Sequence, residues 1–207
     1  MTIFVLFCIE LKKSKTSNHK RTDGLLQLIP VSINFLNFTS FSMIILGIDP
    51  GTCITGYGII SYKNGLTSVI DFGCIKPPAK IKLEQKYLII FEAIESLIET
   101  HRPDYLSIES QFVYKNAQSA LKLGMAKAMA ILAATKRGIP ICEYPPKQVK
   151  LAITGNGSSS KDTVQKRIQL LLSLREPPTP QDASDALSLA LCHAHKLQTK
   201  LKLSKGL

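Results

Sequence analysis

The stretch MIILGIDPGTCITGYGII, residues 43–60, contains an apolar run that ends abruptly at an acidic residue. The run from Met43 to Ile48 has the length and composition of a buried strand. A carboxylate follows at Asp49, and a proline and a glycine come directly after it. Taken alone, Asp49 is either an ordinary turn residue or the first member of a metal site. The rest of the chain has to distinguish these two interpretations.

The residues after this stretch predict an alternation of strands and helices. Residues 56–63 and 66–75 are predicted as a hairpin, because Asn64-Gly65 between two apolar runs is a strong turn signal. Two later apolar runs predict strands over residues 105–109 and 139–144. Helical spacing, together with proline and glycine stops, predicts helices over residues 82–102, 115–138, 146–153, 161–174 and 182–197.

This order of elements predicts an α/β fold with a five-stranded mixed sheet flanked by helices. The first three strands are expected to be antiparallel. The fourth and fifth strands are expected to run parallel to the first through right-handed crossovers, which makes the first and fourth strands neighbours.

The composition limits the kind of protein and its partners. The 207 residues include 26 basic and 15 acidic side chains, a net charge of +11, which indicates a polyanionic partner such as nucleic acid or an acidic membrane surface. No run of 18 apolar residues predicts a membrane-spanning helix. The scattered cysteines, without a Cys-x-x-Cys pair, are typical of free thiols in the cytoplasm rather than of a disulfide framework or a thiolate zinc site. They are Cys8, Cys53, Cys74, Cys142 and Cys192.

The chain divides into three parts by pattern. Residues 1–42 have no periodic apolar face, and their apolar segment precedes the basic one, the reverse of a secretory signal. We expect this extension to lie outside the fold, and one hypothesis is a start-site artefact with Met43 as the working initiator. Residues 43–197 are predicted to form the folded domain, and residues 198–207 a basic tail.

Four carboxylates are predicted to approach one point. Asp49 and Glu109 end two strands expected to be parallel neighbours, about 4.8 Å apart. Asp182 and Asp185 are three residues apart at a helix start and therefore share one face. Like charges gathered in this way call for a cation, and an all-oxygen ligand set favours Mg²⁺ or Mn²⁺. Two such ions would suit in-line displacement at a phosphodiester.

Each acid also has a simpler explanation. Asp182 alone would serve as a helix N-cap and Asp185 as a favourable first-turn charge. Asp49 alone would suit a turn before Pro-Gly. Glu109 is harder to explain in this way, because glutamate is depleted in strands. Considered together, the four positions favour a metal site.

Five ordered blocks of the sequence resemble one known family. They are IILGIDPGTCITGYGII, IESQF, KNAQSALKLGMAKA, EYPPKQVK and DASDALSLALCHAH, collinear from Met43 to about Lys196. They resemble the RuvC family of bacterial Holliday-junction resolvases. The resemblance implies an RNase H-like fold, a homodimer and paired symmetric nicks in four-way DNA junctions with Mg²⁺. The family's catalytic acids match Asp49, Glu109, Asp182 and Asp185, whereas the extension at 1–42 departs from its pattern.

The same resemblance suggests residues that contact DNA. Phe112 matches an aromatic residue that contacts unpaired bases near the junction centre, although a core phenylalanine at a strand end is the alternative. Lys150 and Lys161 match basic positions that touch DNA. Lys161 also begins a helix after a flexible loop, where free backbone N–H groups attract phosphate. Three other lysines are expected to be solvated: Lys122, Lys127 and Lys136. Two histidines, His193 and His195, are expected to have structural roles.

Three other functions fit the sequence less well than a resolvase does. An actin-like or sugar-kinase ATPase shares the strand–Asp–Gly-Thr start, but it needs two such domains, for which the chain has no room. A catalytically dead junction-binding module would not need all four acids. A related nuclease acting on RNA is the third alternative, but the motifs DASD and IESQF match the resolvase family better than such a nuclease. The branch-migration proteins RuvA and RuvB are the family's partners, and the helix over 115–137 is the candidate dimer face.

Overall fold

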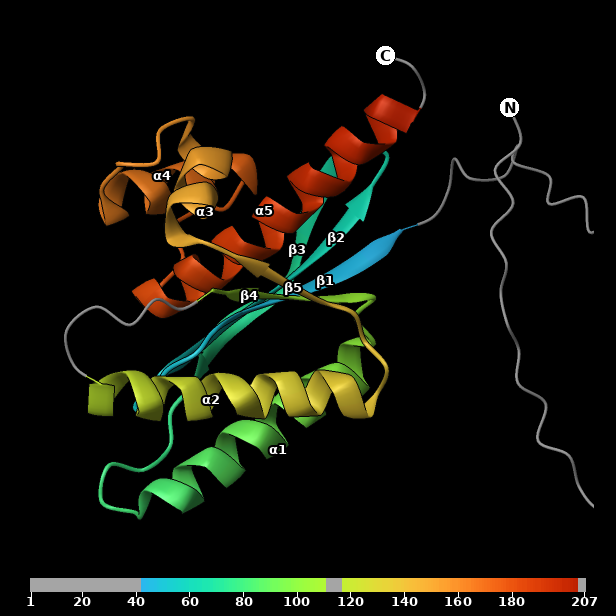
Figure 1. Cartoon of the computed structure of the whole chain (residues 1–207). Coiled ribbons are helices and arrows are strands. Elements are labelled where there is room, and N and C mark those ends of the chain that lie inside the picture. Colours follow the sequence, from blue (N-terminus) through green and yellow to red (C-terminus); the bar gives the residue numbers. More distant parts are fainter. Residues whose placement is uncertain (1–41, 111–116, 205–207) are drawn as a thin grey trace, which may run out of the picture. The chain divides into compact units, whose positions relative to one another are not determined.

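The computed structural model describes residues 42–110 and 117–204 (Figure 1). The predictions for the N-terminal extension up to residue 41 and for Phe112 therefore lie outside the described residues. The strands are β1 (Met43–Asp49), β2 (Thr55–Lys63), β3 (Leu66–Ile75), β4 (Tyr105–Glu109) and β5 (Ile141–Tyr144). The helices are α1 (Leu83–His101), α2 (Ala117–Lys136), α3 (Pro146–Thr154), α4 (Lys161–Leu171) and α5 (Gln181–Ser204).

The five strands form one mixed sheet in the order β3-β2-β1-β4-β5. β1 pairs antiparallel with β2, and β2 with β3, through the hairpin turn at Asn64-Gly65. β4 lies parallel to β1 on its other side, and β5 lies parallel to β4. The predicted sheet and the adjacency of the first and fourth strands are confirmed.

Helices cover both faces of this sheet (Figure 1). α1 and α2 pack on one face, and α5 crosses the other face with α3 and α4 beside it. Alternate residues of β1 supply the two cores, since Ile45 belongs to the core under α5 whereas Leu46 and Ile48 belong to the core under α1 and α2. This is the period of two that a central strand imposes.

Glycines let α5 approach the strands closely. Gly47 of β1 faces Gly58 of β2 in the antiparallel register. A Cβ at Gly47 would collide with the backbone carbonyl of Ala186 and lie 2.9 Å from the backbone nitrogen of Ala190. A Cβ at Gly56 would collide in the same way with the carbonyl of Asp182. The helix backbone therefore rests directly on β1 and β2, and this contact sets the position of its first turn.

The last helix is longer than its pattern predicted. α5 continues to Ser204 instead of ending at Leu197, so the segment expected to be a basic tail from residue 198 extends the helix as far as the described residues go. The sequence explains this extension, because no glycine or proline occurs between Leu197 and Gly206 to end the helix. In the described part of the chain, no helix is both long and apolar enough to cross a membrane.

Candidate active site

Two of the four acids lie side by side at one edge of the sheet. Asp49 is the last residue of β1 and Glu109 the last residue of β4. The residues before them, Ile48 and Ile108, are direct partners in the parallel ladder. Both carboxylate residues are partly buried. The strand pairing thus places the two acids at the same C-terminal edge, as the sequence predicted.

The other two acids are brought to this edge by α5. Asp49 pairs with Gly56 of β2, and the backbone carbonyl of Asp182 lies against that same glycine. Asp185 follows one helical turn later and is also partly buried. Asp182 lies within the first turn of the helix, which begins at Gln181, so it is not the N-cap residue. Three elements far apart in the sequence therefore bring four carboxylates to one region.

Burial of the carboxyl and the nearby acids together raise the pKa of Asp49 to about 7. Burial of the carboxyl is the largest cause, followed by repulsion from Asp185, Glu109 and Asp182, while the positive charge of Lys161 acts in the opposite direction. A carboxyl group in water has a pKa near 3.9, so this side chain is held against ionisation near neutral pH. The site has more negative charge than its own lysines neutralise.

Glu109 shows the same effect in weaker form. Burial and repulsion from Asp185 raise its pKa, whereas three lysines lower it from different elements. These are Lys161 at the start of α4, Lys127 of α2 and Lys150 of α3. The two lysines that the resemblance assigned to DNA binding therefore lie within electrostatic reach of the acids.

Lys161 makes the closest contact with the acidic cluster. Its Nζ donates a hydrogen bond to Oδ2 of Asp185 at 3.2 Å. Partial burial lowers the pKa of Lys161, but attraction to Asp185, and then to Asp49 and Asp182, outweighs this effect, so the pKa is raised overall. The loop before it ends in Ser160, whose side-chain oxygen accepts from the backbone N–H of Thr163 and caps α4.

Lys127 corrects one expectation. The sequence indicated a solvated lysine, but the residue is only 9% exposed, and its Nζ donates to Oε2 of Glu143 on β5 at 2.6 Å. Helical spacing was the available signal, because Lys127 lies on the same face of α2 as the buried Ala126 and Ala130. This ion pair, in which Lys127 is buried and Glu143 is exposed, ties α2 to β5 next to the strand that carries Glu109.

The two histidines have structural surroundings, as expected. The ring of His193 is buried, with Nδ1 at 2.6 Å from the hydroxyl oxygen of Tyr144 and its centroid 4.6 Å from that of Tyr105. Burial, and then the charge of nearby Lys196, lowers the pKa of His193 to about 4. His195 contacts the carbonyl oxygen of Ala152 through Nδ1 at 3.2 Å.

The donor set suits a hard divalent cation. Four carboxylates supply only oxygen ligands, and their mutual repulsion is the condition that a bound cation relieves. Within residues 42–110 and 117–204, however, no three histidine, cysteine, aspartate or glutamate side chains are grouped closely enough to hold an ion. The residues fit the metal in chemistry and in backbone position, and side-chain rotation would have to complete the ligand set.

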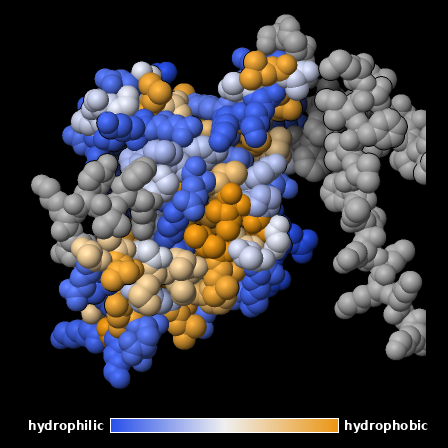
Figure 2. All heavy atoms as spheres, in the orientation of Figure 1, coloured by the Kyte–Doolittle hydropathy of each residue, from blue (hydrophilic) through white to orange (hydrophobic). Residues whose placement is uncertain are grey.

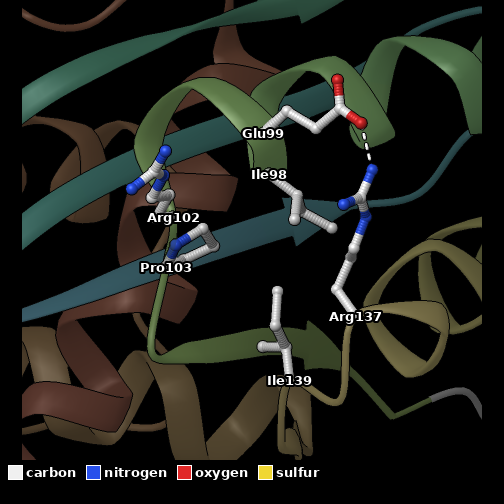
Figure 3. A pocket seen from close by; sticks show the side chains of 6 residues that line it. All are labelled: Ile98, Glu99, Arg102, Pro103, Arg137 and Ile139. Atoms are coloured by element: carbon white, nitrogen blue, oxygen red, sulfur yellow. Dashed lines mark hydrogen bonds and ion pairs between the residues drawn. The ribbon is translucent and has the colours of Figure 1, made fainter.

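A cavity elsewhere on the molecule does not belong to this site. It has a volume of about 370 Å³ and lies between the C-terminal ends of α1 and α2, lined by Ile98, Glu99, Arg102, Pro103, Arg137 and Ile139 (Figure 3). It is near the start of β4, whereas Glu109 is at the end of that strand. Arg137 is paired with Glu99, and basic side chains at helix C-termini complement the helix dipoles.

The sheet is mixed and has this strand order, and acids lie at the ends of two adjacent parallel strands and on the helix that crosses them. These features together define a nuclease of the RNase H-like fold. The family model described as crossover junction endodeoxyribonuclease RuvC matches residues 45–193. The RuvC protein of Protochlamydia amoebophila is 52% identical over 155 residues, which are 75% of this chain and 92% of that protein. The chain therefore belongs to the RuvC family of crossover junction endodeoxyribonucleases.

Solved structures agree with this assignment. The Thermus thermophilus RuvC structure is 28% identical, with a TM-score of 0.71 over 76% of this chain and 97% of that one. Thermus thermophilus RuvC in complex with a Holliday junction substrate is 30% identical, with a TM-score of 0.73 over 76% and 96% of the two chains. The RNase H-like fold that the resemblance implied is confirmed.

Proposed function

We propose that this chain resolves four-way DNA junctions by paired, symmetric, metal-dependent hydrolysis of phosphodiester bonds during recombination and repair. The family is one of metal-dependent nucleases that cut crossover junctions. The observation that carries the proposal is the convergence of four carboxylates from β1, β4 and α5, where burial and then repulsion from the other three acids raise the pKa of Asp49 to about 7. A bound cation would relieve such a charge excess, and this supports the proposal.

Asp49, Glu109, Asp182 and Asp185 are the proposed catalytic residues and metal ligands. We propose two Mg²⁺ ions, which Mn²⁺ can replace, because carboxylate oxygens suit both. When bound, the ions supply the positive charge that activates the attacking water and stabilises the leaving 3′-oxygen. The two strand residues hold their carboxylates on the rigid sheet edge, and α5 holds the other two through its direct contact with Gly56 and Gly47.

DNA binding is assigned to the basic side chains beside the acids. Lys150 on α3 and Lys161 on α4 both lower the pKa of Glu109, and this electrostatic reach to the acids supports their role in binding DNA phosphates. A relative, Thermus thermophilus RuvC, has been solved with a Holliday junction substrate. Phe112, which is proposed to stack on an unpaired base, follows Glu109 by three residues but lies outside the described ranges.

Paired nicks require two active sites, and we propose a homodimer that meets through α2. Its outer face carries Leu121, Met125 and Leu132, which are 69%, 50% and 53% exposed and lie on one side of the helix. Figure 2 shows apolar side chains over the part of the surface that α2 forms in Figure 1. Leu132→Glu should convert a dimer into a monomer in sedimentation velocity, and a wild-type monomer at micromolar concentration would contradict the assignment.

Two further proposals concern the cellular context. We propose action in the cytoplasm, because the cysteines of the described residues are all free. RuvA and RuvB, the family's branch-migration partners, are proposed partners through the junction that all three would share. Their effect would be measured by adding them to a junction-cleavage reaction.

Cleavage of three substrates tests the main proposal. A four-way junction, a linear duplex and an RNA–DNA hybrid of matched sequence should be incubated with the protein and Mg²⁺. We expect paired nicks in the junction and little cutting of the other two substrates. Preferred cutting of the hybrid would instead assign the site to RNA, and undetectable cutting of all three would refute the proposed function.

A further inference from the structure

Lys161 occupies an unusual place among the residues around the acids. Within the described part of the chain, Asp185 is the one proposed metal ligand that takes part in an ion pair, and Lys161 is its partner. The same ammonium is attracted by Asp49 and Asp182. Its positive charge therefore lies where a divalent cation would be attracted by the same carboxylates.

We propose that Lys161 acts as an internal counter-cation that holds Asp185 until a DNA phosphate draws the lysine away, so that DNA and the divalent metal bind cooperatively. This inference rests on the proposed function, since it concerns the same acids. It adds a coupling between substrate and metal that neither the fold nor the acids alone would supply.

The two partners differ in freedom of movement. Asp185 lies near the start of a helix whose backbone rests on β1 and β2, and its side chain is 29% exposed. The Lys161 side chain is 63% exposed and stands at the first position of α4, after the loop that Ser160 ends. A lysine is a compact, strongly hydrated charge on a flexible stem. Lys161 is therefore the partner that can leave, and a phosphate oxygen would accept the hydrogen bond that it gives up.

The expected size of the effect follows from the exposure of the pair. Exposed ion pairs are worth a factor of roughly 1.5 to 5 in an equilibrium constant. Loss of this pair should therefore strengthen metal binding in the absence of DNA by up to about fivefold. By linkage, it should weaken the mutual enhancement of metal and DNA binding by the same factor.

The test compares three variants with the wild type. Lys161→Gln removes both the charge and the contact, whereas Lys161→Arg keeps a cation that can still pair with Asp185. Lys150→Gln is the matched control, because Lys150 also lowers the pKa of Glu109 but is in no ion pair with a described acid. Ca²⁺ is the probe, since it takes the same oxygen ligands, and the junction must be shown to stay intact during the measurement.

Two equilibria are measured for each protein. Calorimetry gives the Ca²⁺ affinity without DNA, and fluorescence anisotropy gives the affinity for a labelled four-way junction with and without Ca²⁺. We expect Lys161→Gln to bind Ca²⁺ about two- to fivefold more tightly than Lys150→Gln does, and to lose a similar factor of the enhancement by Ca²⁺. Lys161→Arg should retain most of that enhancement.

Several outcomes would overturn the proposal. Equal Ca²⁺ affinity in Lys161→Gln and Lys150→Gln would show that only the general field of the lysines matters. An unchanged enhancement in Lys161→Gln would show that the lysine does not compete with the metal. Failure of the wild type to bind or cut a junction would instead refute the proposed function. Because the Lys161 side chain is largely exposed, all variants are expected to fold, which circular dichroism checks.

Discussion

Replacing Asp49 by asparagine should make the metal-free protein more stable while it destroys nicking. The pKa of this carboxyl is raised from 3.8 to about 7 by burial and by its acidic neighbours. A difference of about three pKa units corresponds to about 4 kcal/mol of folding free energy. The asparagine side chain has a similar shape but no charge, so above pH 7 it should restore up to this amount.

The pH dependence gives this prediction its sign. Between pH 4 and pH 7 the folded protein keeps the Asp49 proton that the unfolded chain has already lost, so wild-type stability falls as the pH rises through this range. The advantage of Asp49→Asn should therefore be about 4 kcal/mol at pH 8, about 2 kcal/mol at pH 5 and close to zero below pH 4. At pH 8 the melting temperature should rise by roughly 10 °C.

Urea unfolding of both proteins at pH 8 and pH 5, with a chelator present, measures these differences. Glu176→Gln, at an exposed position, is the control and should show no such gap. Mg²⁺ should stabilise the wild type at pH 8 more than it stabilises the variant. An Asp49→Asn protein that is equally or less stable at pH 8, or a gap that does not change with pH, would refute the account of clustered, repelling carboxylates.

Three other predictions concern packing, DNA contacts and the extension. Gly56→Ala should destabilise the fold by about 1–3 kcal/mol or more, because the added methyl group meets the backbone of α5; a urea midpoint equal to that of the wild type would contradict the close approach. Lys150→Ala should lower the log–log salt slope of junction binding by roughly 0.9, whereas Phe112→Ala should keep the slope and slow single-turnover nicking more than it weakens binding; normal nicking by Phe112→Ala would make that residue a core phenylalanine. Deletion of residues 1–42 should leave solubility and nicking largely intact, since β1 starts at Met43; an insoluble or inactive truncated protein would place the extension within the fold.

Features that depend on local pattern could be predicted from the amino-acid sequence. The period of two in the strands, the Asn64-Gly65 turn and the helical spacing are all short-range properties, and the structure has a strand or helix at each predicted position, although the last helix continues beyond its predicted end. Asp49 and Glu109 could be assigned to one sheet edge because the order of elements allows few topologies. Collinear blocks that resemble one family supplied the remaining site residues, and the assignment of the chain to that family is confirmed.

Features that depend on contacts between distant segments could not be predicted without the folded structure. The burial of Lys127 against Glu143 joins α2 to β5, and no local pattern shows that a lysine in an alanine-rich helix has such a partner. The contact of α5 with Gly56 likewise requires both elements to be in place. The raised pKa of Asp49 arises for the same reason, because burial and repulsion act through space, between side chains that strand pairing and helix packing bring together from three separate parts of the chain.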